Sequence, residues 1–208
     1  MHPYLTRLGI RPEVQRFFRP FYSSDGLGNL VFSYGEAAEH FGFAFHRIPV
    51  TDEFWLAGNL TFSQVWMIIL SGSALDALSW MNKKMAGFPQ IGNLLFLSLG
   101  AGMSEAQLLQ IRSSLGGKQF RLLFGRDLLG RIADLKVAAG IKGCPLSVYL
   151  DESEQVVVSF RSRNFAFSQE QFSLSAFERA AGVRFGMATD KPKGYLTFFD
   201  ELKAEAGL

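Results

Sequence analysis

The chain lacks the features that mark secreted and membrane proteins. It has one cysteine, Cys144, so it cannot form an internal disulfide, which is typical of a reducing compartment. It has no apolar run close to the roughly 20 residues of a transmembrane helix. Its first residues lack the basic and then apolar pattern of a signal peptide. We therefore expect a cytoplasmic protein without a membrane partner.

Charge of either sign is also scarce. Lys and Arg number 21 against 19 Asp and Glu, a net charge of +2, and charged residues make up 19% of the 208 residues. This balance does not by itself indicate nucleic-acid binding, although local basic patches stay open. Hydrophobic residues make up 48%, with 21 Phe. Because Phe is among the most buried residue types, we expect a large aromatic core.

Several familiar catalytic patterns are missing. There is no P-loop, and the glycine-rich stretch after Leu97 lacks the third glycine of a dinucleotide-binding turn. Cys144 has no nearby histidine and precedes a proline, which favours a structural role over a nucleophilic one. His2, His40 and His46 do not stand at metal-ligand spacing, and we interpret His46 as a surface or hydrogen-bonded histidine.

An apolar run followed by a helix-length amphipathic segment occurs three times in succession. The runs cover residues 65–70, 94–102 and 120–127. This alternation predicts a β-α-β-α-β-α unit, in which helices bury both faces of a mostly parallel sheet. Ser104 and Gln107 form a capping box that marks the start of the second helix, and we expect Gly140 to end the third.

The segment before this unit predicts a short helix and a small antiparallel sheet. Pro12 suits the first turn of a helix over residues 12–18. Residues 30–34 and 41–49 are expected to be strands joined by a loop, and the second strand would place Phe41, Phe43 and Phe45 on one face.

The segment after the unit predicts two more strands and two helices. Residues 145–151 and 155–160 are close enough to pair as antiparallel neighbours and would make the sheet mixed. A helix is expected over residues 174–181, opening at Ser173 or Ser175 and ending at Gly182, and an amphipathic helix closes the chain. We therefore divide the chain into an N-terminal α+β segment (1–62), an α/β core (63–143) and a C-terminal segment (144–208).

Two stretches combine arginines with apolar or aromatic side chains. Arg7, Arg11, Arg16 and Arg19 make the start of the chain locally basic. We interpret them as a solvated face, with a phosphate-contacting edge as the alternative. Residues 159–167, SFRSRNFAF, match an ordinary alternating strand or a surface that stacks on single-stranded bases, and we favour the strand.

The predicted strand ends carry the candidate site residues, since ligand sites of parallel sheets lie at the carboxyl ends of the strands. These ends are SGS at residues 71–73, GAG at 100–102 and GRD at 125–127. The candidate ligand- or phosphate-binding residues at or near these ends are Gly72, Ser73, Gly100, Gly125, Arg126 and Arg131.

These strand ends resemble the Toprim domain, the metal-binding fold of primases, topoisomerases and related nucleases. SGSALDALS (71–79) is similar to the "ESAIDALS" of mobile-element members, SLGAG (98–102) to the "SLGG" turn, and FGRDLLGR (124–131) to the DxD motif followed by "AGR". YLTRLGIRPEV (4–14) and NLVFSY (29–34) resemble the segment that precedes Toprim in such proteins. The resemblance covers about the first two-thirds of the chain and implies a Rossmann-like Toprim core.

The chain departs from that family at two carboxylate positions. The family glutamate falls on Gly72, the first aspartate of DxD falls on Gly125, and only Asp127 keeps its carboxylate. Mg²⁺ wants several oxygen ligands in near-octahedral geometry, so one carboxylate would hold it only weakly. The guanidinium groups of Arg126 and Arg131 would also compete with a cation. We expect no cofactor and an absent or crippled metal site, with Asp127 as the residual metal and catalytic candidate.

Three interpretations follow for the corner of the sheet that carries Gly72, Gly125 and Asp127. In the first, which we weight most, Asp127 caps the third helix and the site is a relic. In the second, the glycines expose backbone N–H groups near helix starts to an anionic phosphate, assisted by Arg126, Arg131 and Lys118. In the third, catalysis survives through Asp76 or, less well placed, Asp134.

The leading functional hypothesis is a catalytically degenerate Toprim-like protein of DNA processing or mobile-element transfer that binds nucleic acid, a nucleotide or a protein partner. An enzyme is therefore the less favoured outcome. The alternatives are an active, Mg²⁺-dependent primase-like or nuclease-like enzyme of phosphoryl transfer, and an interaction or structural subunit.

Overall fold

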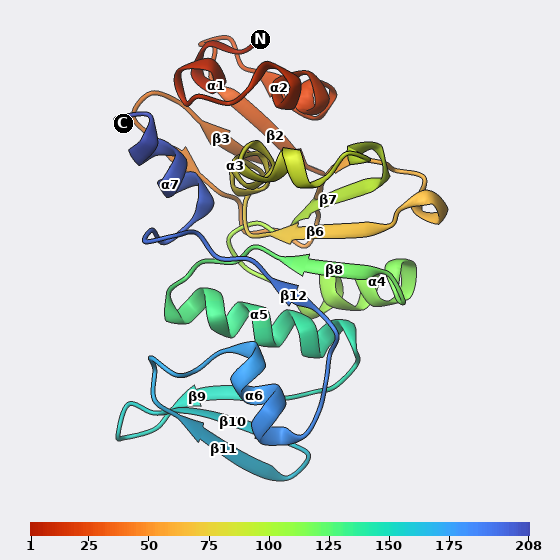
Figure 1. The fold of residues 1–208 in the computed structure, drawn as a ribbon, viewed down its shortest axis with the longest axis vertical. Helices are drawn as coiled ribbons and strands as arrows, with labels where there is room; N and C mark the ends of the chain where they lie inside the picture. Colours follow the sequence, from red (N-terminus) through yellow and green to blue (C-terminus); the bar gives the residue numbers. More distant parts are fainter.

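A five-stranded mixed sheet forms the middle layer of the protein, whose computed structural model describes residues 1–208 (Figure 1). Its order is β12-β8-β6-β7-β5. Strands β6, β7, β8 and β12 run parallel, whereas β5 is antiparallel to β7. The bounds are β5 Trp55–Gly58, β6 Met67–Ser71, β7 Leu94–Ser98, β8 Gln119–Leu122 and β12 Ala188–Thr189. The predicted α/β class is therefore confirmed.

Helices cover both faces of this sheet. The connecting helices are α3 (Ala74–Lys84), α4 (Glu105–Leu115) and α5 (Leu128–Ile141). Every residue of β6 and β7 is buried, as expected of strands between two layers. Ile69 packs with α3 and the N-terminal segment, and Ile68 packs with α4 and α5. The protein therefore has two hydrophobic cores, one on each face of the sheet.

The helix starts lie at the capping residues that the sequence predicts, whereas one predicted helix end is wrong. The capping box of Ser104 and Gln107 is confirmed, and Ser73 caps α3. Gly140 does not end α5, which continues to Ile141. A Cβ at Gly140 would lie 2.6 Å from Leu108 Cδ1, so this glycine permits the close approach of α4 and α5.

The N-terminal segment packs on the α3 face of the sheet. Its helices are α1 (Pro3–Arg7), α2 (Pro12–Phe18) and the 3-10 helix η1 (Arg19–Phe21). Its four-stranded antiparallel sheet has the order β1 (Ser23–Ser24), β2 (Leu30–Tyr34), β3 (Ala37–Phe41) and β4 (His46–Arg47). The same part of the chain supplies β5 to the central sheet.

Two predictions for this segment are wrong. Most of the expected loop at residues 35–40 belongs to β3, because Gly35, at φ +59°, allows a two-residue turn after β2. The expected strand over 41–49 is broken, and Phe43 and Phe45 lie exposed in the turn between β3 and β4. An aromatic face with Phe41 therefore does not form.

The C-terminal segment builds its own antiparallel sheet. It has the order β11 (Arg163–Phe167), β10 (Val156–Phe160) and β9 (Ser147–Leu150). The expected pairing of the two strands is confirmed, but they do not join the central sheet, whose antiparallel member is β5. Helix α6 (Leu174–Ala181) begins after Ser173 and ends at Gly182, as predicted.

The chain then returns to the central sheet. Strand β12 pairs with β8, and α7 (Phe198–Glu205) lies beside α3 (Figure 1). The shorter 3-10 helices are η2 (Phe62–Gln64), η3 (Met85–Gly87) and η4 (Ile91–Asn93). No helix combines the length and the apolar character needed to cross a bilayer. The start of α7 thereby reaches the carboxyl ends of the parallel strands.

Replacing a buried aromatic residue by alanine should destabilise the protein far more than the same replacement at an exposed aromatic residue. Phe96 is fully buried on β7, with ring centroids 4.9 Å from Phe18 and 5.9 Å from Phe17. Phe96→Ala should lower the free energy of unfolding by about 3–5 kcal/mol, because it leaves a cavity. Phe43→Ala, at a side chain that is 78% exposed, should change it by less than about 0.5 kcal/mol. Urea unfolding of both variants checks the contrast, and equal losses would contradict it.

Candidate functional site

A cavity of about 450 Å³ opens at the carboxyl ends of the parallel strands. Three strand-to-helix loops and the start of α7 form its walls. The polar and glycine residues that line it are Gly72, Asp76, Gly100, Gly102, Gly125, Asp127, Gly130, Thr197 and Asp200. No Lys, Arg or His side chain lines it. Its chemistry is therefore that of carboxylates, backbone and apolar side chains.

The structure brings some of the predicted residues together here and places others elsewhere. Gly72, Gly100, Gly125 and Asp127 line the cavity. Ser73 is buried below it, where its hydroxyl accepts a hydrogen bond from the N–H of Asp76 (3.0 Å).

The predicted cationic residues do not line the cavity. Arg126 lies on a shallow neighbouring surface with Tyr195. The guanidinium of Arg131 donates to the carbonyl oxygens of Glu170 and Phe172, each at 3.1 Å, and so contacts the C-terminal segment. Lys118 donates to the carbonyl of Val65 at the opposite end of the sheet. The expected assistance of Lys118 is therefore wrong, because it precedes β8 rather than following it.

Asp127 acts as a helix cap. Its Oδ1 accepts a hydrogen bond from the N–H of Gly130 (2.8 Å), and its backbone is extended as a cap requires. This confirms the contact expected from the first interpretation of the corner. A carboxylate at this position also faces the positive end of the α5 dipole.

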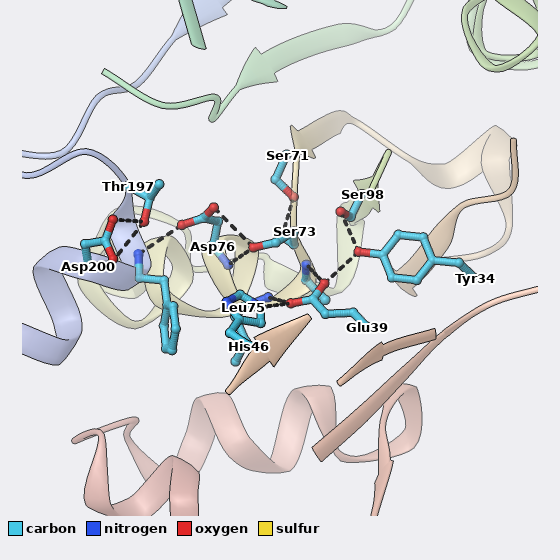
Figure 2. Close-up of polar contacts among 12 residues, drawn as sticks. Tyr34, Glu39, His46, Ser71, Ser73, Leu75, Asp76, Ser98, Thr197 and Asp200 are labelled. Carbon is cyan, nitrogen blue, oxygen red and sulfur yellow. Dashed lines mark hydrogen bonds and ion pairs between the residues drawn. The ribbon is translucent and has the colours of Figure 1, made fainter. Parts of the chain in front are cut away.

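Glu39, which the sequence did not single out, is the most deeply buried carboxylate near the strand ends (Figure 2). It lies on β3 and is 0% exposed. Its Oε2 accepts hydrogen bonds from the N–H of Ala74 (2.7 Å) and the hydroxyl of Tyr34 (2.8 Å). Its Oε1 lies 3.3 Å from the N–H of Leu75 and 2.9 Å from Nε2 of His46. Four donors thus surround one carboxylate at the start of α3.

No local pattern marks Glu39, because its partners lie 35 and 36 residues away on α3. His46 is a partly buried histidine with a carboxylate partner, as its interpretation as a hydrogen-bonded residue anticipates. The hydroxyl oxygens of Tyr34 and Ser98 lie 2.7 Å apart, within hydrogen-bond distance, so the network reaches the end of β7.

Asp76 links α3 to α7 (Figure 2). Its Oδ1 accepts from the N–H of Phe199 (2.9 Å), and its Oδ2 accepts from the hydroxyl of Ser73 (3.1 Å). Burial raises the pKa of Asp76 to about 6, and these hydrogen bonds oppose the rise only in part. Asp76 also lines the cavity, as the third interpretation requires.

Asp134 lies outside the cavity and forms an ion pair with Lys191. The ammonium also donates to the carbonyls of Phe124 and Gly125, both at 2.9 Å. Burial raises the pKa of Asp134 to about 6 and lowers that of Lys191. One Asp134 oxygen has no hydrogen-bond partner. This pair fastens the chain after β12 to the end of β8 and leaves Asp134 unavailable to a ligand in the cavity.

Three helix starts at the strand ends therefore hold carboxylates of the chain itself. Glu39 occupies the start of α3, Asp127 that of α5 and Asp76 that of α7. An anionic phosphate would have to displace one of them and would meet negative charge at the others. The geometry gives the phosphate-binding interpretation little support at this corner.

Gly72 and Gly125, which the motif resemblance aligns with carboxylates, differ in the space around them. A Cβ at Gly72 would meet nothing closer than 3.8 Å, so a side chain fits. A Cβ at Gly125 would lie 2.8 Å from Asp127 Oδ1, so the cap would have to move. Nowhere do three or more His, Cys, Asp or Glu side chains gather as a metal ion would require.

The remaining sequence candidates have structural surroundings. The favoured interpretation of residues 159–167 as one alternating strand is wrong, because Arg161 and Ser162, both at positive φ, form the turn of a hairpin between β10 and β11. Phe160 is buried, and Phe165 and Phe167 pack against the same core. Cys144 is partly buried in the link between α5 and β9, and its thiol lies 3.7 Å from the carbonyl of Lys142.

Comparison of the chain with protein-family models, curated proteins and solved structures finds no match.

Removal of the Glu39 carboxylate should lower the free energy of unfolding more than a substitution at the surface. Glu39→Ala leaves two buried N–H groups and a hydroxyl without an acceptor, and we expect a loss of about 3–5 kcal/mol. Tyr34→Phe removes one donor and should cost about 1–2 kcal/mol. Chemical unfolding monitored by circular dichroism measures both, and a loss for Glu39→Ala no larger than that for Tyr34→Phe would contradict the network.

Asp76 should make stability fall as the pH rises through the acidic range. Its pKa in the folded protein, about 6, exceeds the value near 3.9 of an unfolded chain, so the folded state binds the extra proton between those values. The free energy of unfolding then decreases between about pH 4 and pH 6 and is level above. The Asp76→Asn side chain does not titrate. As the pH rises across that window, the free energy of unfolding of this variant should therefore increase by about 2–3 kcal/mol relative to that of the natural protein.

Urea unfolding of both proteins at about pH 4 and about pH 7 measures this difference, since other groups titrate alike in each. Parallel pH dependences would show that Asp76 ionises normally.

Proposed function

We propose that this chain is a Toprim-like protein of DNA processing or mobile-element transfer that acts by binding and has lost metal-dependent phosphoryl transfer. In this proposal it works in the cytoplasm and holds nucleic acid, a nucleotide or a protein partner. The family and the process rest on the motif resemblance at residues 71–79, 98–102 and 124–131. The loss of catalysis rests on the contacts of the strand-end cavity.

The observation that carries the proposal is the use of carboxylates as structural groups. Asp127, the one side chain kept at the family's metal positions, accepts the N–H of Gly130 and holds the start of α5. Glu39 is fully buried and already has four hydrogen-bond donors. A divalent ion would have to replace these contacts before it gained its own ligands.

The glycines reinforce this conclusion. Gly72 and Gly125 contribute no oxygen ligand from a side chain, and two-metal phosphoryl transfer depends on several carboxylates that bridge and hold the ions. The cavity also has no cationic side chain to stabilise the charge of a transferred phosphoryl group.

An active enzyme remains the second candidate because of one observation. Asp76, Asp127 and Asp200 line the same cavity, although they come from α3, α5 and α7. A rearrangement that released Asp76 from Phe199 and Asp200 from Lys203 would offer two further carboxylates to a cation.

An interaction subunit is the third candidate. Leu129 and Leu196 line the cavity while being 74% and 59% exposed, and Val50 beside it is 84% exposed. Exposed apolar groups around a cavity are typical of a protein-binding surface.

Metal titration separates binding from catalysis. We expect the natural protein to show no saturable heat with Mg²⁺ or Mn²⁺ in the millimolar range, and Asp127→Asn to behave alike. The variant Gly72→Glu should gain measurable Mn²⁺ affinity, because Gly72 has room for a side chain and its carboxylate would join Asp127.

The single variant Gly72→Gln is the matched control, since it has similar bulk and no charge. Mn²⁺ binding to the natural protein together with phosphoryl transfer that Asp127→Asn abolishes would overturn the proposal in favour of the enzyme.

A further inference from the structure

The turn between β3 and β4 presents two aromatic rings to solvent. Phe43 is 78% exposed and Phe45 is 48% exposed, although Phe is among the most buried residue types. The N–H of Gly42 donates to the carbonyl of Phe45 (3.0 Å) and closes the turn. A Cβ at Gly42 would lie 2.6 Å from the Phe45 ring, so glycine lets that ring lie over the backbone. The rings are therefore held on a closed turn.

Unpaired arginines accompany these rings. The guanidinium carbon of Arg7 lies 5.7 Å from the centre of the Phe43 ring, in the geometry of a cation–π contact. Arg7 ends α1, which lies at the same end of the protein as β3 and the C-terminal part of α7 (Figure 1). Arg47 follows Phe45 by two residues on β4 and is exposed, and neither arginine forms an ion pair. Their charges are thus available to an anionic partner.

A hollow of about 180 Å³ adjoins the same ring. Tyr4, Phe41 and Phe43 supply aromatic walls, and Arg7 supplies positive charge, whereas the Lys203 ammonium, which also lines the hollow, is paired with Asp200 (2.8 Å). This volume lies below the roughly 300–1,000 Å³ of sites for drug-sized ligands, so it suits one flat ring rather than a whole cofactor. Such a hollow beside a cation matches a base attached to a phosphate backbone.

We propose that this surface, the Phe43 patch (Arg7, Phe43, Phe45 and Arg47), binds single-stranded nucleic acid. Bases stack on the two phenylalanine rings, and the arginines contact phosphates. The identity of the partner rests on the proposed binding function, but the patch is separate from the strand-end cavity. Unpaired arginines beside exposed rings favour a polyanion with flat bases over an apolar protein segment.

Neither the strand-end cavity nor the C-terminal sheet offers this combination. The strand-end cavity carries carboxylates and no cationic side chain. The aromatic residues of β10 and β11 are packed against α6, with the Phe165 and Phe177 rings 5.6 Å apart. Of the four arginines at the start of the chain, Arg7 alone takes in this proposal the phosphate-contacting role that the sequence left as an alternative.

Fluorescence anisotropy with a labelled thymidine oligonucleotide of about 16 residues tests the Phe43 patch on the full chain. Phe43→Ala should weaken binding about 5- to 150-fold, as expected for the loss of one stacked base, and Phe43→Trp should restore it. Arg7→Gln should reduce the slope of log Kd against log salt by about 0.7, which is the loss of one phosphate contact.

Matched controls come from the C-terminal sheet. Tyr149, 47% exposed, is replaced by Ala, and Arg163, whose guanidinium lies 5.1 Å from the Phe165 ring centre, is replaced by Gln. Both should leave affinity and salt slope unchanged. Circular dichroism confirms that each variant is folded.

The outcomes separate the two proposals. If the natural protein binds the oligonucleotide and Phe43→Ala matches Tyr149→Ala, the patch is excluded while the proposed binding function stands. If the natural protein does not bind, the patch proposal is overturned, and the proposed function is reduced to a nucleotide or a protein partner. If Phe43→Ala instead abolishes concentration-dependent self-association in ultracentrifugation, without oligonucleotide binding, the patch is a protein interface and the proposal fails.

Discussion

The buried carboxylate of Glu39 is the interaction on which the arrangement of the N-terminal half depends. A charge at 0% exposure is costly unless hydrogen bonds replace its water, and here Ala74, Leu75, Tyr34 and His46 do so (Figure 2). These donors come from α3, β2 and β4. The need to satisfy one carboxylate therefore fixes the small antiparallel sheet against the first helix of the core.

The same principle operates at the other strand ends. Helix starts expose N–H groups and the positive end of a dipole, which attract an anion from any source. In many α/β proteins that anion is a ligand, whereas here Asp127 and Asp76 supply it from within the chain. Stability and ligand binding compete for the same donors. A corner that satisfies its own helix starts is well suited to hold the fold together and poorly suited to hold a phosphate.

Short-range patterns predicted much of the architecture. Ser73, Ser104 and Ser173 mark three helix starts because each cap satisfies an N–H group three residues away, a distance that sequence spacing records. The limits of β3 were missed because Gly35 made a turn of two residues where a longer loop was expected. The sequence predicts the antiparallel member of the central sheet at 145–160, whereas β5 occupies that place, because pairing between distant strands leaves no local signal.

The sequence by itself determined the alternation of apolar runs and helices, hence a sheet buried on both faces, and it placed glycine at positions 72 and 125. Periodicity and capping decide these features within a few residues. Only the tertiary structure decided that Glu39 reaches α3, that Arg131 turns away to Phe172 and that Phe43 stays exposed beside Arg7. Such contacts join residues far apart in the chain, so they depend on how separate elements pack and on which buried charges find partners.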